Sequence, residues 1–232
     1  MDGEVQELTD LSWTRLEDWI PRFTLGGSGW KLEGTVFCPN GRRGFVYLLS
    51  VTNTGPTKRR FTLGWRGSWG STLFTAFSSR RSLGSNLAWY NRWTRTLTFE
   101  HRAGLPVAAW ALGLSQPLAE CQWELGGGQG EEEITSAPGK TIDFSLGKNV
   151  ELLPGDSFQL ALYLAANREA DGASTCVVDL QRRGWSSLLE SHRSWLQARR
   201  PVKQIQGRAS YLANLNGFFS CFFARAKCID TE

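Results

Sequence analysis

The recurrence of turn-forming residues constrains the fold of this 232-residue chain more than any other feature. Between Leu11 and Asn167, clusters of Gly, Pro, Asn and Asp return about every ten positions, the spacing typical of all-β domains. They separate short runs of β-branched, aromatic and aliphatic residues, of which residues 45–51 (FVYLLSV) are the densest. No helical period interrupts this series, so the sequence predicts a mainly β fold, a large antiparallel β-sandwich. The specific strands predicted are residues 30–37, 45–51, 60–65, 72–77, 94–101, 107–112, 120–125, 141–150 and 156–165.

After Asn167 the spacing of apolar residues changes to the period of a helix. Apolar residues from Val177 to Leu196 form a stripe that predicts helix over residues 173–199. Gly184 lies in its middle and costs about 1 kcal/mol relative to Ala, so we expect two helices or a kink there. This helical stripe ends at Arg199–Arg200, because the residue directly before a proline (Pro201) disfavours the helical conformation.

A second helical stripe occupies the end of the chain and includes Phe218, Phe219, Phe222 and Phe223 on one face. Such a face needs a large apolar partner, so we expect it to be covered by this chain, by a helical barrel or by a second copy. The expected organisation is a β-sandwich over residues 1–170, a helical linker over 171–200 and a first barrel helix over 201–232. Two or three C-terminal helices are therefore predicted.

Composition argues against several classes of protein. No apolar run is long enough to span a membrane, and the acidic start does not resemble a signal peptide. The five cysteines are scattered without metal-site spacing, which favours free thiols and predicts a cytoplasmic location. A net charge of +4 without a recognition motif argues against nucleic acid as a partner.

Four stretches carry a resemblance to a known class of enzyme. They are residues 44–53 (GFVYLLSVTN), LPGD at 153–156 with DGA at 171–173, GWSSLLESHRSW at 184–195, and NLNGFF at 214–219 with the final IDTE. Together they resemble the N-terminal β-supersandwich, helical linker and first barrel helix of glycoside hydrolases with an (α/α)6 barrel, such as glucoamylase-like and debranching-type enzymes. In those families the general acid and base lie in later barrel loops. The resemblance therefore implies a chain truncated before its catalytic barrel, with no catalytic residue and no cofactor.

Two tryptophan pairs are the candidate carbohydrate-binding residues. Trp65 and Trp69, like Trp89 and Trp93, are four residues apart with polar or small residues between them. An indole ring suits the apolar face of a pyranose, and side chains with polar donors suit its hydroxyl groups. The candidate donors are Asn91 and Arg92, with Asn86, Arg66 and His101 in addition. The alternative is that about half of these tryptophans form the sandwich core, which the abundance of buried aromatics in large sandwiches favours.

Other charged clusters predict no site. Glu17–Asp18 and the run Glu131–Glu133 are interpreted as solvated surface, because charged runs are usually exposed. The basic doublets are spread through turns and interleaved with acids, so a single-strand nucleic-acid groove is the weaker interpretation. His101 and His192 are expected to be structural, since a metal site needs a third ligand.

The sequence thus predicts a non-catalytic β-sandwich domain of a carbohydrate-active enzyme. It would pack against a barrel and bind an oligo- or polysaccharide, with glucan as the expected class, on exposed tryptophan. Three alternatives stay open. They are a self-standing carbohydrate-binding protein, a small glycoside hydrolase with a carboxylate pair, and a binder of single-stranded nucleic acid.

Overall fold

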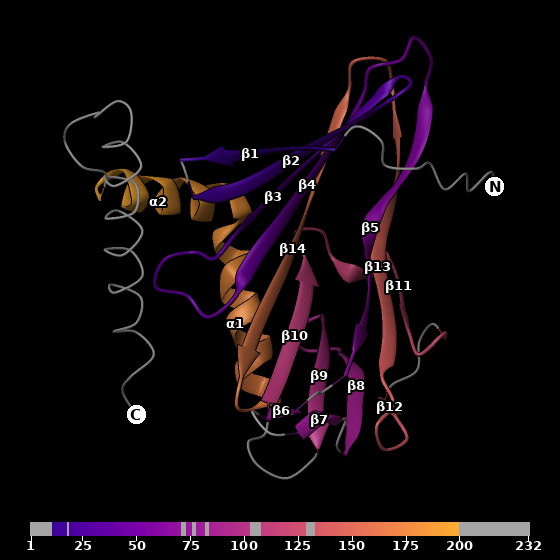
Figure 1. Cartoon of the computed structure of the whole chain (residues 1–232). Helices are drawn as coiled ribbons and strands as arrows, with labels where there is room; N and C mark the ends of the chain where they lie inside the picture. Colours follow the sequence, from indigo (N-terminus) through magenta and orange to yellow (C-terminus); the bar gives the residue numbers. More distant parts are fainter. Residues whose placement is uncertain are drawn as a thin grey trace.

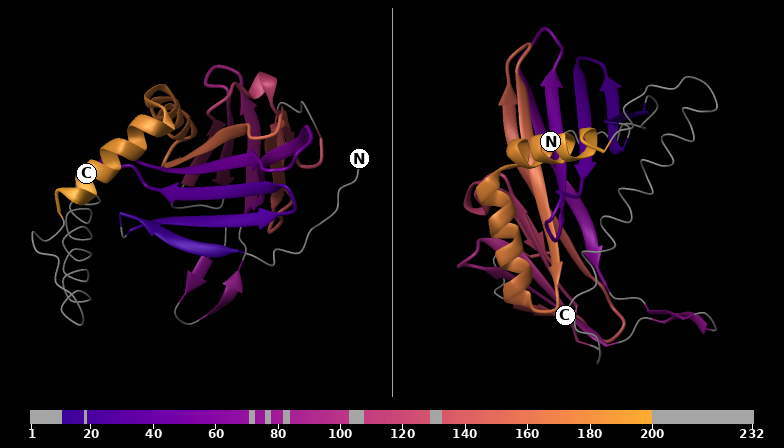
Figure 2. Two further views of the ribbon diagram at one scale, coloured as in Figure 1. Left: turned by 90° about the horizontal axis from the view of Figure 1, so that it is seen from above. Right: turned by 90° about the vertical axis from the view of Figure 1, so that its left-hand side faces the viewer.

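Three layers make up the fold of the computed structural model, which describes residues 11–17, 19–70, 73–75, 78–81, 84–102, 108–128 and 133–199. A nine-stranded antiparallel sheet forms the middle layer. Two helices cover one of its faces and a three-stranded sheet covers the other (Figures 1 and 2). The predicted mainly β fold, a large antiparallel sandwich with C-terminal helices, is confirmed.

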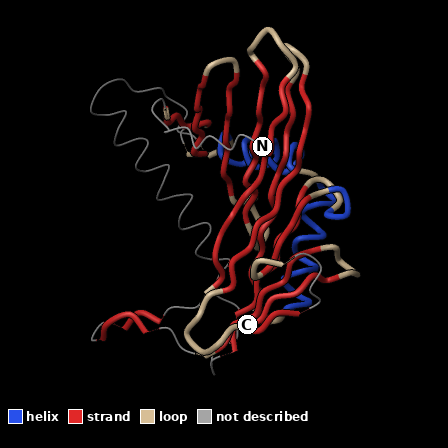
Figure 3. The backbone as a smooth tube through the Cα atoms, turned by 90° about the vertical axis from the view of Figure 1, so that its right-hand side faces the viewer, coloured by secondary structure: helices blue, strands red, loops and turns tan. Residues whose placement is uncertain are grey.

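The large sheet brings together strands from both ends of the described chain. Its order is β1 (Ser12–Leu16), β2 (Ile20–Gly27), β3 (Trp30–Phe37), β4 (Phe45–Asn53), β14 (Ser157–Asn167), β10 (Ala108–Leu114), β9 (Thr96–Arg102), β8 (Ser85–Asn91) and β12 (Glu133–Thr135). The small sheet has the order β11 (Gln122–Leu125), β13 (Ile142–Leu152) and β5 (Arg59–Trp69). A separate hairpin of β6 (Leu73–Thr75) and β7 (Ser78–Arg81) projects from the body (Figure 3), and a 3₁₀ turn, η1, spans Leu118–Glu120.

One hydrophobic core fills the space between the two sheets. Alternate residues of β5 and β13 face inward, so Leu63, Leu146 and Leu152 meet Leu112 and Leu160 of the large sheet. Aromatic rings pack on this cluster, including Phe99 of β9 and Phe144 of β13, whose centroids are 5.2 Å apart. The outward positions of the small sheet are therefore left for polar residues.

A second core lies between the large sheet and helix α1 (Ala170–Arg183). The sheet offers a floor of small side chains there (Ala109, Ala111, Ala161 and Ala165, all fully buried), which lets the helix approach closely. At Gly113 of β10 an added Cβ would lie 2.8 Å from Val177, so only glycine fits beneath the helix. Gln181 fixes the same end of α1 by donating to the carbonyl of Leu114 at 2.9 Å.

The helical stripe divides at Gly184, as the sequence predicts. Helix α1 ends at Arg183 and helix α2 runs from Trp185 to Gln197. Gly184 has φ 75° and ψ 144°, a conformation that is essentially restricted to glycine, and its N–H caps α1 through the carbonyls of Leu180 and Gln181. The chain turns sharply at this point (Figure 2, right). No helix in the described part of the chain has the length and apolar character that a membrane crossing requires.

Most strands named from the sequence are present, with shifted ends. The prediction over residues 94–101 becomes β9, which starts at Thr96 because the two residues before it belong to a turn. The structure adds five strands that the sequence pattern does not mark individually, namely β1, β2, β7, β8 and β12. Strand β12 follows the Gly-rich residues 126–130, whose composition is typical of a loop. The predicted terminal helix, with Phe218, Phe219, Phe222 and Phe223, lies outside the described residues, and the division into three domains stays a prediction.

The interpretation of Glu17 as solvated surface is wrong. Its side chain is only 8% exposed, and Oε1 accepts hydrogen bonds from Arg193 Nη2 at 2.9 Å and Gln197 Nε2 at 3.0 Å. The carboxylate therefore ties the turn after β1 to helix α2. The adjacent Asp18, like Glu131 and Glu132, lies outside the described residues, whereas Glu133 is exposed on β12 as expected for a solvated acid.

Candidate functional site

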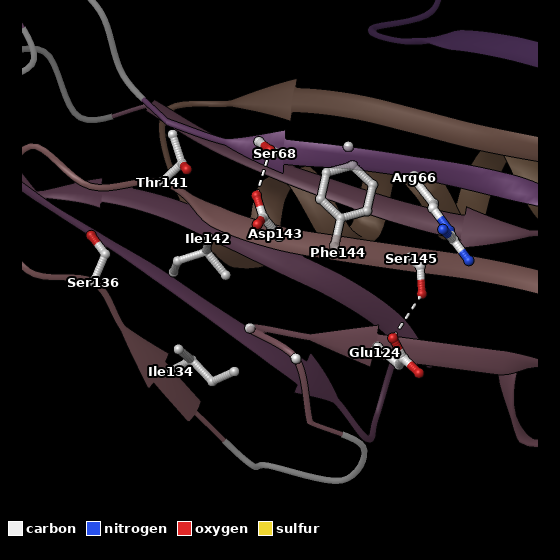
Figure 4. A pocket seen from close by; sticks show the side chains of 13 residues that line it. Arg66, Ser68, Glu124, Ile134, Ser136, Thr141, Ile142, Asp143, Phe144 and Ser145 are labelled. Atoms are coloured by element: carbon white, nitrogen blue, oxygen red, sulfur yellow. Dashed lines mark hydrogen bonds between the residues drawn. The ribbon is translucent and has the colours of Figure 1, made fainter.

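The outward face of the small sheet is a ladder of polar pairs set by strand register. Thr62 lies opposite Asn149, Arg66 opposite Ser145, and Ser68 opposite Asp143. On the other side of β13, Glu124 of β11 is also opposite Ser145. Two carboxylates are thereby held by serine hydroxyls, with Ser68 donating to Asp143 and Ser145 donating to Glu124 at 3.5 Å (Figure 4).

A hollow of about 790 Å³ opens at the end of this ladder. Strand β11 stops at Leu125, so β13 loses its neighbour there, and the turn at Gly126–Gly127 and the nearby Ile134 close the far side. We call this space the main hollow. Its polar lining consists of Arg66, Ser68, Glu124, Ser136, Thr141, Asp143 and Ser145. Figure 4 shows β5 and β13 on one side of it and Ile134 and Ser136 on the other.

A second hollow of about 500 Å³ continues along the same strands and is called here the end hollow. Gly64 and Gly147 are directly opposite each other in its lining, and neither has a side chain to fill the space. An added Cβ at Gly64 would lie 2.4 Å from the carbonyl oxygen of Leu146, so larger residues are excluded. Arg66, Glu124 and Ser145 line both hollows, which makes them one continuous depression.

This depression offers hydrogen bonds of both kinds beside a small apolar wall. The Arg66 guanidinium supplies only donors, the Glu124 and Asp143 carboxylates supply acceptors, and the hydroxyl groups supply either. Ile134 and Phe144 contribute apolar surface to the main hollow. Its volume lies within the ~300–1,000 Å³ of ordinary small-molecule sites. Such a lining suits a hydroxyl-rich molecule.

The first predicted tryptophan pair contacts the core. Trp65 and Trp69 both point between the sheets, where Trp65 meets Tyr47 with ring centroids 5.6 Å apart. Trp69 lies 5.6 Å from Phe99 and 5.8 Å from Trp110, again between centroids. Burial also raises the pKa of Tyr47 above its ordinary value. Trp65 is also in the lining of the end hollow, and it is the one predicted tryptophan in the lining of either hollow.

The second pair lies elsewhere. Tyr90 stacks on Trp123 between the sheets with centroids 5.0 Å apart, so its neighbour Trp89 points to the opposite face of the large sheet. Trp93 is 96% exposed in the turn between β8 and β9. Asn91 shapes this turn, because its Oδ1 accepts the backbone N–H of Trp93 at 3.0 Å, and Arg92 is exposed beside it. The structure therefore does not bring the four tryptophans together, and sugar binding by them stays a prediction.

Two further candidate donors form a buried network next to the main hollow. His101 Nδ1 and Asn86 Oδ1 are 2.8 Å apart, and Asn86 Nδ2 donates to the carbonyl of Lys140 at 2.6 Å. Since the amide oxygen only accepts, the imidazole carries its proton on Nδ1. Burial lowers the pKa of His101, which favours the neutral ring. Ser136 receives the N–H of Asn86 at 3.0 Å, so this network positions one residue of the hollow.

Sequence reasoning missed the acidic residues of the depression. Glu124 on β11 and Asp143 on β13 are 19 positions apart in the sequence, and only strand register brings them to one face. The polar alternation of residues 141–150 predicts a strand, but it does not distinguish Asp143 from the other outward residues. Of the predicted donors, Arg66 alone lies in the depression.

Comparisons with known proteins show the fold. No protein-family model matches the sequence, and no curated protein matches it. A bacterial glucoamylase solved with acarbose matches with a TM-score of 0.50 at 7% identity, over 82% of this chain and 29% of that chain. A provisionally assigned kojibiose phosphorylase from the human microbiome gives a TM-score of 0.48 at 10% identity, over 82% and 25% of the chains. For a provisionally assigned aldose 1-epimerase from Escherichia coli K12, the values are 0.42 and 11%, over 69% of both chains.

The glucoamylase match extends beyond the strands. Residues 1–167 make up 167 of 232 positions, or 72% of the chain, whereas the match covers 82%. It therefore includes part of the segment that begins with α1. At this identity the likeness establishes a shared fold, and the chain spans less than a third of that glucoamylase.

Proposed function

We propose that this chain is a non-catalytic β-sandwich domain, with its helical linker, of a carbohydrate-active enzyme. The observation that carries the proposal is the shared fold with the bacterial glucoamylase, which continues from the strands into the helical segment. Helices α1 and α2 lie on the face of the large sheet away from the small sheet (Figure 1). A helical catalytic barrel would pack on this helical side.

The proposed ligand of the domain is a glycan. The depression on the small sheet combines a guanidinium, two carboxylates and several hydroxyls, which is the mixture of donors and acceptors that sugar hydroxyls require. Trp93 offers a second candidate contact, because its ring is fully accessible and a sugar face could stack on it. The proposed location in the cell is the cytoplasm, supported by the free thiols of Cys121 and Cys176.

A glycan screen on the purified chain tests the proposal. Soluble α- and β-glucans would be titrated while tryptophan fluorescence and affinity-gel retardation are followed. We expect saturable binding to at least one neutral glucan. A folded chain that is silent toward every glycan would contradict the binding role.

The variants must separate a loss of binding from a loss of the fold. Trp93→Ala removes the accessible ring without touching the core, because the side chain is 96% exposed. Trp65→Ala is unsuitable on its own, because truncating a core tryptophan costs about 3–5 kcal/mol and would confuse binding with unfolding. Circular dichroism of each variant would confirm that the fold is kept.

A small glycoside hydrolase is the second candidate, favoured by the two carboxylates in one depression. Glu124 and Asp143 lie on adjacent strands and on the same face of the small sheet. An inverting glycosidase would need their carboxyl groups about 6.5–9.5 Å apart. Turnover of aryl glycosides that disappears in both Glu124→Gln and Asp143→Asn would favour this candidate. Binding without turnover would favour the non-catalytic domain.

A further inference from the structure

The two hollows form an elongated track that follows the strands of the small sheet. Along β5 it extends from Thr62 in the end hollow to Ser68 in the main hollow. Six steps of an extended strand span about 20 Å. Arg66 stands in the middle and borders both hollows. A monosaccharide would occupy only part of such a track, whereas a chain of several sugar units would fill it.

The charge of the track selects a neutral ligand. Among the described residues that line the two hollows, Arg66 is the one cationic side chain and Glu124 and Asp143 are anionic. Each carboxylate accepts one serine hydroxyl and has acceptor capacity left over, because an ionised carboxylate offers about four lone-pair sites. Hydroxyl groups of a ligand satisfy these acceptors, whereas carboxylate or phosphate groups would be repelled by them.

The floor of the track is shaped for close approach. Gly64 and Gly147 face each other in the end hollow and expose backbone where other residues would carry side chains. Beside them, Thr62 donates its hydroxyl to Asn149 Oδ1 at 2.7 Å, which fixes the rim. The ligand therefore meets a fixed, polar surface, so few side chains of the protein lose conformational freedom when it binds.

The track also lies away from the helices. The small sheet and helices α1 and α2 are on opposite sides of the large sheet (Figures 1 and 2). A partner domain that packs on the helical side would leave the track open.

We infer that the main and end hollows together bind an extended, neutral oligosaccharide along β5 and β13, on the face opposite the helices. This inference rests on the proposed function, since it specifies the site and the class of glycan. Arg66 is the central contact, and Glu124 and Asp143 accept hydrogen bonds from the sugar hydroxyls. Thr62 marks the far end of the ligand.

The test compares ligand lengths on the full chain by calorimetric titration. The probes are glucose, maltopentaose, cellopentaose and a galacturonate oligomer of the same length. We expect one neutral pentasaccharide to bind at least tenfold more tightly than glucose, and more tightly than the galacturonate oligomer. Arg66→Ala should weaken that pentasaccharide at least tenfold, and Glu124→Gln should weaken it as well.

Two variants serve as controls within the same strand. Arg60→Ala lies on the same face but outside both hollows, so pentasaccharide affinity should stay within twofold of the unchanged chain. Thr62→Trp fills the end hollow, so it should weaken binding of the pentasaccharide at least tenfold. Circular dichroism verifies folding in each case.

The outcomes separate this inference from the proposed function. Pentasaccharide binding that survives Arg66→Ala and Glu124→Gln but is lost in Trp93→Ala overturns the inference and leaves the proposed function standing. Equal affinity for glucose and the pentasaccharides overturns the inference that the ligand is extended. Tighter binding of the galacturonate oligomer overturns the inference that the ligand is neutral. A folded chain that binds none of the probes overturns both proposals.

Discussion

Replacing Glu17 with Gln tests whether a buried carboxylate holds helix α2 to the first hairpin. In the structure Oε1 accepts three hydrogen bonds, from Arg193 Nε at 3.0 Å, Arg193 Nη2 at 2.9 Å and Gln197 Nε2 at 3.0 Å. Gln keeps the shape but removes the charge. It also introduces an amide N–H₂ whose hydrogen atoms face these donors unless the amide turns.

The magnitude follows from the burial of the two partners. Breaking a fully buried ion pair costs about 3–5 kcal/mol, and hydrogen bonds to a charged group contribute about 1.5–3 kcal/mol. Glu17 is 8% exposed, but Arg193 is 35% exposed and can recover solvation. We therefore expect Glu17→Gln to lower the free energy of unfolding by about 2 kcal/mol.

Urea denaturation followed by circular dichroism provides the measurement. With a slope of about 3 kcal/mol per molar urea, the midpoint should fall by about 0.7 M. Glu190→Gln is the matched control, because Glu190 pairs with the same Arg193 at 3.3 Å but is 69% exposed. It should change the free energy by less than about 0.5 kcal/mol. Equal effects of the two variants would refute the argument from burial.

Three further predictions concern titration and backbone geometry. Because burial lowers the pKa of His101, the unfolded state takes up its proton first, so stability should fall as pH drops below 6.5; His101→Asn should flatten this slope in urea titrations. Hydrogen bonds from Lys58 and Arg60 lower the pKa of Glu151 to about 2. The stabilising contribution of this carboxylate is therefore present above pH 4.5 and is lost as the pH falls through about 2. NMR titration should show this low midpoint, and Arg60→Ala should raise it. Gly184→Ala should cost about 1–3 kcal/mol in thermal unfolding because of the backbone conformation at Gly184, and a loss equal to that of a Gly26→Ala control would contradict this reasoning.

The strands could be predicted because the sequence alternates locally. Residues 141–152 place Ile142, Leu146 and Leu152 inward, and the same period places Leu63 inward on β5. Gly184 likewise predicts the break between α1 and α2, because glycine is unfavourable inside a helix. These features depend on neighbours in the sequence, so no tertiary knowledge was needed.

The polar sites could not be predicted because they depend on contacts between distant segments. Thr98 and Phe99 lie on opposite faces of β9, as the period of a strand requires, but that period does not reveal that Thr98 is fully buried, 3.0 Å from the hydroxyl of Ser174 on α1. In the sequence Glu17 is indistinguishable from a surface acid, because its partner Arg193 on α2 is 176 positions away. The same holds for the depression, where Glu124 and Asp143 meet only through the register of β11, β13 and β5.

The most direct test of the account is to map bound oligosaccharide on the chain by NMR. Amide shifts would be recorded while the neutral pentasaccharide that binds best is titrated into the labelled chain. The account predicts that the shifts cluster on β5, β13 and β11 around Arg66, Asp143 and Glu124, with helices α1 and α2 unaffected. Shifts confined to the turn at Trp93, or to the helices, would contradict it.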